Sequence, residues 1–143
     1  MIFLALVLAS TGASEAQGFD PEQKLRNYFA VLSDPALTGL GDVFAPNAVL
    51  EDPVGPPPNY GRKAVVEYLT NLRSLFSEIH FEVPRVFVVT PNEAGVTWIA
   101  HAVAAGSGKT IEVHGMAVFT FNDAGEIRSL REWWELADLL SQL

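Results

Sequence analysis

Residues 80–134 read HFEVPRVFVVTPNEAGVTWIAHAVAAGSGKTIEVHGMAVFTFNDAGEIRSLREWW, and this stretch decides the fold. Apolar and polar residues alternate along it with a period of two, which is typical of strands with one buried face. The pattern predicts four strands, over residues 80–90, 95–105, 110–122 and 126–134. The connections PNEA, GSGK and NDAG contain good turn residues and are too short for crossovers. We therefore expect an antiparallel meander.

Helical patterns precede these strands. Asp20 can cap a helix that starts at Pro21, because the pattern LxxYFxxL repeats at helical spacing over residues 25–32. A second helix is expected from Gly61 to about Phe76. Helices followed by long strands predict an α+β fold, with the helices on one face of a bent sheet.

The remaining segments carry weaker patterns. We expect a short helix over roughly residues 36–44, a short strand over 48–51, and a helix or a tail over 135–143. No internal repeat or linker divides the chain, so residues 17–143 are expected to form one domain.

Composition limits the class of partner. The chain has 143 residues, of which 49% are hydrophobic, and a formal net charge of −8. Phosphate contacts need clustered Lys and Arg, so this balance argues against a nucleic-acid partner. The chain has no cysteine, which excludes disulfides and thiolate chemistry.

The first sixteen residues, MIFLALVLASTGASEA, differ from the rest. Their apolar run is too short to span a bilayer and ends in small residues, as a signal peptide does, although it lacks a positive start. An overlong start or an N-terminal arm is the alternative. Cleavage would make the protein secreted or periplasmic, and otherwise it would be cytoplasmic; no membrane insertion is expected after removal of a leader.

Asp52 stands in EDPVGPPPNYG, residues 51–61, where a short strand meets a proline-rich loop. A carboxylate on a stiffened strand end is well placed to move a proton next to a carbonyl, if it faces a dry pocket. Burial there would raise its pKa by desolvation. Glu51 should point to the opposite face, so the two are not a dyad. The alternative is an Asp that caps its own turn.

A pocket is suggested by Trp98, Ala100 and Ala102, which share one strand face. Small alanines there would leave a cavity, unless bulky helix residues fill the space. Tyr28 lies on the apolar stripe of the first helix and must find a polar partner when buried.

NYFAVL around Tyr28, VFAPNAVLEDPVG with Asp52, FTFNDAGEI and the last strand with Trp134 together resemble the ketosteroid isomerase family. The resemblance covers about residues 20–135 and extends to the wider SnoaL-like and NTF2-like superfamily. It implies a cone of helices on a strongly curved, largely antiparallel sheet that encloses a pocket, and a homodimer formed through the outer sheet face, where Trp133 could lie.

The resemblance also implies roles for individual residues. Asp52 would be the proton-transfer base and Tyr28 an oxyanion-hole donor. A second acid of the oxyanion hole falls on Ala117, which cannot donate, and His114 could replace it only through a bulge. A further family tyrosine falls on Leu69, beside Tyr68. The expected substrate-binding residues are Phe44, Tyr60, Tyr68, Trp98, Ala117 and Trp134.

Two other motifs are expected to carry no chemistry. GSGKT, residues 106–110, lacks the first glycine of a phosphate-binding loop and joins two strands. The three histidines have no metal-ligand spacing, so we expect no metal.

The resemblance thus implies a cofactor-independent isomerase that moves a double bond into conjugation with a ketone, weakened at Ala117. Its ligand would be a small apolar ketone, such as a steroid or a polyketide. A SnoaL-like polyketide cyclase and a non-catalytic steroid or lipid carrier are the alternatives.

Overall fold

The structure is a computed structural model that describes residues 18–143. The expected leader, residues 1–16, lies outside the described residues. The elements follow one another along the chain as α1 (Pro21–Ser33), the 3₁₀ helix η1 (Leu40–Val43), β1 (Phe44–Glu51), β2 (Asn59–Tyr60), α2 (Arg62–Arg73), β3 (Phe76–Thr90), β4 (Glu93–Ala104), β5 (Thr110–Phe121), β6 (Ile127–Trp133) and α3 (Leu136–Gln142).

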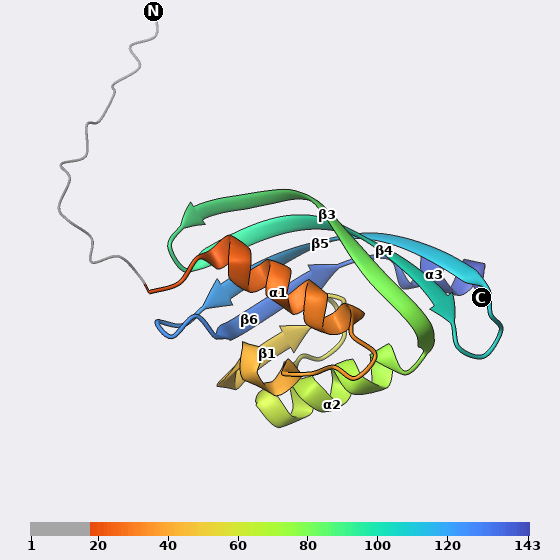
Figure 1. The fold of residues 1–143 in the computed structure, drawn as a ribbon, viewed down its shortest axis with the longest axis horizontal. Coiled ribbons are helices and arrows are strands. Elements are labelled where there is room, and N and C mark those ends of the chain that lie inside the picture. The colour runs from red at the N-terminus through yellow and green to blue at the C-terminus, as the bar shows by residue number, and fades with distance from the viewer. Residues whose placement is uncertain (1–17) are drawn as a thin grey trace, which may run out of the picture.

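All six strands belong to one sheet, in the order β2-β1-β6-β5-β4-β3. The pairs β3–β4, β4–β5 and β5–β6 are antiparallel, which confirms the expected meander. β1 pairs with β6 in parallel, so the sheet is mixed. Figure 1 shows the long strands curving over α1, with α2 beside β1. The α+β fold with helices on one face of a curved sheet is confirmed.

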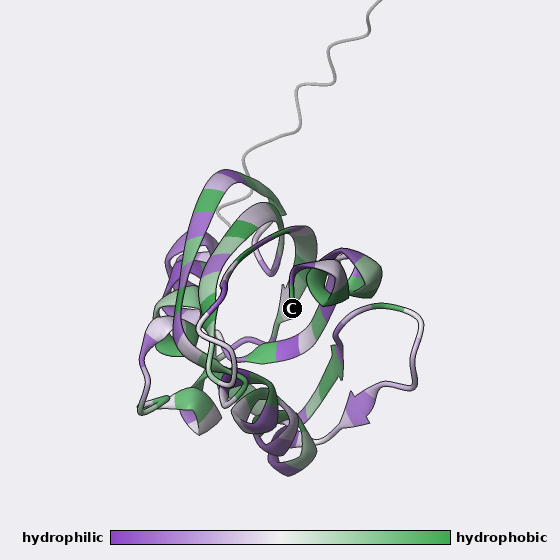
Figure 2. Cartoon of the chain, turned by 90° about the vertical axis from the view of Figure 1, so that its right-hand side faces the viewer, coloured by the Kyte–Doolittle hydropathy of each residue, from purple (hydrophilic) through white to green (hydrophobic). Residues whose placement is uncertain are grey.

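The period of two in the sequence matches the burial of the strands. In β4, Val96, Trp98, Ala100 and Ala102 are buried while their neighbours are more exposed. The hydropathy bands alternate along the strands in Figure 2 for the same reason. Strands β4 and β5 therefore each give one row of buried side chains to the interior of the fold, whereas β3 has no buried residue.

The first helix follows its expected start signals. The carboxylate of Asp20 accepts a hydrogen bond from the backbone N–H of Glu22 at 3.0 Å, and Pro21 occupies the first turn. Leu25, Tyr28 and Phe29 are buried on its inner side. The apolar stripe thereby places Tyr28 inside the fold.

Some boundaries differ from the expectations. The short helix expected over 36–44 is reduced to η1, because Gly39 has a left-handed backbone with φ of 80° that an α-helix does not continue. Strand β1 begins at Phe44, four residues before the expected start. Residue Phe76, expected to end a helix, instead opens β3, and residues 136–142 form a helix rather than a tail.

Among residues 18–143, no helix is long and apolar enough to cross a membrane.

Small residues on β5 make room for the large side chain of Trp98. Gly115 is the direct cross-strand partner of Trp98. A Cβ atom added to Gly115 would lie 2.2 Å from Cζ2 of the indole ring, well inside contact distance. The ring can therefore occupy its position only because residue 115 has no side chain.

We predict that Gly115→Ala destabilises the protein by about 1–3 kcal/mol, because the methyl group overpacks the interior against Trp98. The free energy of unfolding, measured by urea denaturation, tests this. Gly106→Ala is the matched control, since a Cβ at this hairpin position meets nothing within 4 Å and its backbone is not left-handed. Equal stability of the two variants would contradict the prediction.

Candidate functional site

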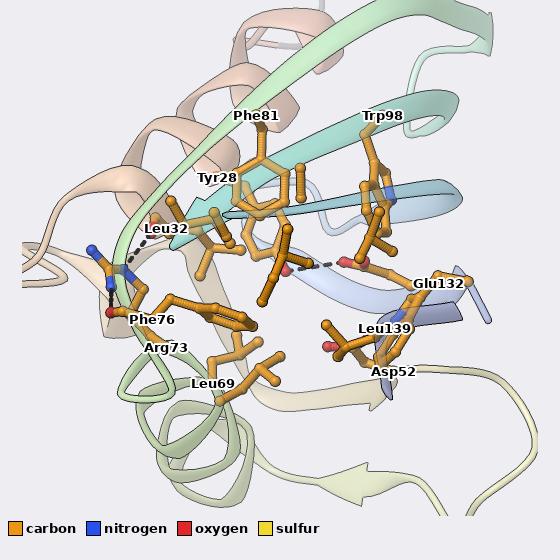
Figure 3. A pocket seen from close by; sticks show the side chains of 17 residues that line it. Tyr28, Leu32, Asp52, Leu69, Arg73, Phe76, Phe81, Trp98, Glu132 and Leu139 are labelled. Carbon is orange, nitrogen blue, oxygen red and sulfur yellow. Dashed lines mark hydrogen bonds between the residues drawn. The ribbon is translucent and has the colours of Figure 1, made fainter. Parts of the chain in front are cut away.

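An apolar cavity lies between the curved sheet and the three helices. It encloses about 670 Å³ of empty space, including its open mouth. Figure 3 shows side chains from all sides pointing into it. Most are apolar, among them Leu32 of α1, Leu69 and Leu72 of α2, Ile79 and Phe81 of β3, and Leu139 of α3.

The alanines of β4 leave space rather than facing bulky helix residues. Trp98, Ala100 and Ala102 all line the cavity. Trp98 is 4% exposed, and its indole Nε1 has no hydrogen-bond partner within residues 18–143. The sequence left the choice between a cavity and a filled core open, and the structure shows the cavity.

Asp52 follows β1 directly and is joined to Pro53 by a cis peptide bond. The indole N–H of Trp134 donates a hydrogen bond to Asp52 Oδ1 at 2.5 Å. The Tyr68 hydroxyl donates to the backbone carbonyl of Asp52. One contact holds the carboxylate and the other holds its backbone, so the side chain is fixed at the cavity wall.

Burial changes the acidity of Asp52. Desolvation raises its pKa from 3.8 to about 6, and the hydrogen bond from Trp134 opposes this rise because it stabilises the ionised form. A carboxylate with a pKa near neutrality is a better proton acceptor than an ordinary surface Asp. Glu51 instead pairs with Arg131 on the opposite face.

A second carboxyl group, which we did not predict, lines the same cavity. Glu132 of β6 is 5% exposed, and the Tyr28 hydroxyl donates to its Oε1 at 3.0 Å. Desolvation and the charge of Asp52 raise the pKa of Glu132 well above its ordinary value, while the bond from Tyr28 opposes this. Alternation along REWW could have revealed it, because Glu132 and the predicted Trp134 share a face.

Tyr28 lines the cavity and is almost completely buried. It is 1% exposed, and its ring packs edge-on against Phe29, Phe44 and Phe119. Burial, followed by the neighbouring charge of Glu132, raises its pKa well above the ordinary value. Its hydroxyl therefore stays protonated and is directed at Glu132.

The other predicted residues lie in different places. Trp98 and Trp134 line the cavity. Phe44 and Ala117 are fully buried but are not among the lining residues, and Tyr60 of β2 is 69% exposed. Tyr68 reaches the site only through its bond to the backbone of Asp52.

The two dismissed motifs form local surface structure. GSGKT lies at the turn between β4 and β5. His114 bonds to Glu112 at 2.7 Å and is exposed. Among residues 18–143, no group of three or more acidic or histidine side chains is arranged to hold a metal ion.

Comparison with known protein families identifies the family of this chain. The model of the SnoaL-like domain family matches residues 25–130.

Three solved structures share the fold. The epoxide hydrolase/cyclase-like enzyme SalBIII, described in pyran ring formation in polyether salinomycin, is 23% identical with a TM-score of 0.73, over 82% of this chain and 92% of that chain. RV0760c from Mycobacterium tuberculosis, in complex with estradiol-17beta-hemisuccinate, is 22% identical with a TM-score of 0.74, over 84% of this chain and 98% of that chain. A computationally designed 17-OHP binder is 22% identical with a TM-score of 0.74, over 84% of this chain and 97% of that chain.

We predict that Trp134→Phe raises the pKa of Asp52 further, because the lost N–H stabilises the ionised carboxylate. Carboxyl ¹³C NMR titration of Asp-labelled protein measures this pKa. Trp133→Phe is the control, since that ring lies on the other face of β6 beneath the guanidinium of Arg131. An unchanged or lower pKa in Trp134→Phe would show that the indole does not set the acidity of Asp52.

Proposed function

Because the chain belongs to the SnoaL-like domain family, we propose that it is a cofactor-independent isomerase of the ketosteroid type. Its substrate would be a flat apolar ketone bound in the cavity, with a double bond one carbon removed from conjugation. The observation that carries this proposal is the carboxylate of Asp52, fixed against an apolar cavity with a pKa near neutrality.

The reaction follows from this placement. Asp52 removes a proton from the carbon between the ketone and the double bond, and the electron pair moves onto the ketone oxygen to give a dienolate. Asp52 then returns the same proton to the far carbon of the diene, which leaves a conjugated ketone. No proton is gained or lost overall, so neither a cofactor nor a second base is required.

The walls of the cavity support an apolar polycyclic ligand. Phe81 and Trp98 pack edge to face at 5.9 Å between ring centroids, and both line the cavity with Phe76 and Trp134. Aromatic side chains offer flat surfaces on which rings can stack. Two structures of the same fold, RV0760c and the designed 17-OHP binder, were solved as proteins that bind steroids. This supports a ligand with the size of a steroid.

A polyketide cyclase is the second candidate. It is favoured by the presence of two carboxyl groups on one cavity, since ring closure uses an acid and a base together. The fold similarity to SalBIII also favours a cyclase.

The homodimer remains a prediction for either function.

We predict that the protein converts a β,γ-unsaturated ketosteroid to the conjugated enone, and that Asp52→Asn lowers kcat by about 10²–10⁴-fold because the base is lost. The rate constant kcat/KM should rise as the pH increases through about 6, since only ionised Asp52 accepts the proton. Absorbance of the conjugated enone follows the reaction.

Glu51→Gln is the control for Asp52→Asn. It removes a neighbouring carboxylate on the opposite face and should keep the rate of the wild type. A rate that Asp52→Asn leaves unchanged would refute the base. Tight steroid binding without turnover would identify a carrier, and turnover of polyketide esters alone would identify the cyclase.

A further inference from the structure

Glu132 lies directly across the sheet from Ala117, the position where the resemblance places a second acid. The two residues are cross-strand partners in the antiparallel pair β5–β6. Directly opposite side chains point to the same face, with their Cβ atoms about 4.5–5.5 Å apart. Ala117 is 0% exposed and presents only a methyl group, so the longer side chain of Glu132 has room to extend beside it.

The hydroxyl of Tyr28 donates its hydrogen bond to Glu132, and both side chains line the cavity. The only hydrogen bond from this phenol within residues 18–143 goes to Glu132 Oε1, and aromatic rings enclose its own ring. In Figure 3 the Glu132 carboxyl group extends from β6 to the phenol, on the same side of the cavity as Asp52. The second oxygen, Oε2, accepts no hydrogen bond from residues 18–143.

We propose that Glu132 donates the hydrogen bond to the ketone oxygen of the ligand, and that Tyr28 is a positioning residue that acts through Glu132. This rests on the proposed function, because it assigns the acid that works beside the base Asp52. The acid is supplied by β6 instead of β5, at the adjacent position in the sheet.

The surroundings of Glu132 favour its neutral form. The titratable groups that face it are Tyr28 from α1 and Asp52 after β1, with Tyr68 from α2 bound to the backbone of Asp52. Within residues 18–143 no Lys or Arg forms an ion pair with Glu132. Two adjacent buried carboxylates resist ionising together, so one proton stays on the pair, on the group with the higher pKa.

The proton balance is then complete. Neutral Glu132 accepts from Tyr28 at Oε1 and donates its own O–H to the ketone oxygen. When Asp52 takes the proton from carbon, negative charge moves to the ketone oxygen and the Glu132 O–H stabilises it. Glu132 keeps its proton, and Asp52 returns its proton to the ligand.

The test compares Glu132→Gln with Glu132→Leu. Glutamine is neutral at every pH and keeps both a donor and an acceptor, so it should retain kcat within about tenfold of the wild type. Leucine has neither, and should lose about 10²–10³-fold in kcat. If the Gln variant falls as far as the Leu variant, Glu132 works as an ionised group and the proposal fails. Glu132→Ala serves if the Leu variant does not fold.

Two measurements need no turnover. Carboxyl ¹³C NMR of Glu-labelled protein should show Glu132 protonated at pH 7, with its pKa lowered in Asp52→Asn because a neighbouring charge is removed. The infrared C=O stretch of a bound saturated ketosteroid should shift to lower frequency in the wild type and in Glu132→Gln, but not in Glu132→Leu. The proposal would be overturned if Glu132 were ionised at pH 7. It would also be overturned if the C=O stretch shifted equally in the wild type, Glu132→Gln and Glu132→Leu, or did not shift in the wild type.

These outcomes separate the two proposals. The isomerase hypothesis fails if the protein does not turn over the ketosteroid, or if Asp52→Asn leaves the rate unchanged. The NMR and infrared results would then still show whether Glu132 donates a hydrogen bond to a bound ketone. Conversely, normal turnover in Glu132→Leu together with a severe loss in Asp52→Asn would keep the isomerase and reject Glu132 as its acid.

Discussion

Two carboxyl groups line one apolar cavity, and within residues 18–143 neither forms an ion pair with a Lys or Arg side chain; this electrostatic constraint governs the site. Asp52 directly follows β1 and Glu132 lies on β6, and these two strands are paired neighbours in the sheet. The charge of Asp52 adds to burial in raising the pKa of Glu132. Arg73 also lines the cavity; its Nε and Nη1 donate to the carbonyls of Leu32 and Phe76, and its buried Nη2 has no hydrogen-bond partner within residues 18–143. In our proposal the pair holds one proton, with Glu132 as the neutral acid and Asp52 as the charged base, and the two differ in their hydrogen-bond partners.

The cavity exists because the sheet is built from small residues at chosen points. The short side chains of Ala100 and Ala102 leave space on the inner face of β4, and the absence of a side chain at Gly115 makes room for the ring of Trp98. A domain of this size has enough other core, in Phe119, Leu130 and their neighbours, to tolerate a hollow of this kind. The proposed catalysis depends on these small side chains, which leave space for a ligand, as much as on the carboxyl groups of Asp52 and Glu132.

Several features were predictable because they depend on local rules. The cap at Asp20, the stripe carrying Tyr28 and the alternation of β4 need only neighbours along the chain, and all appear as expected. The position of Asp52 directly after a strand was predictable for the same reason, since a strand that ends before Pro53 depends only on neighbouring residues. The parallel pairing of β1 with β6 was not predicted, because it joins segments about 80 residues apart and no turn between them fixes its register.

The sequence by itself determined the α+β class, the antiparallel meander, and the position of Asp52 at the end of a strand. Tertiary structure alone decided that Tyr28 bonds to Glu132, 104 positions away, and that Trp134 bonds to Asp52, 82 positions away. Periodicity fixes which face of an element a side chain occupies. It does not fix which distant face lies opposite, because that depends on how the curved sheet and the helices pack.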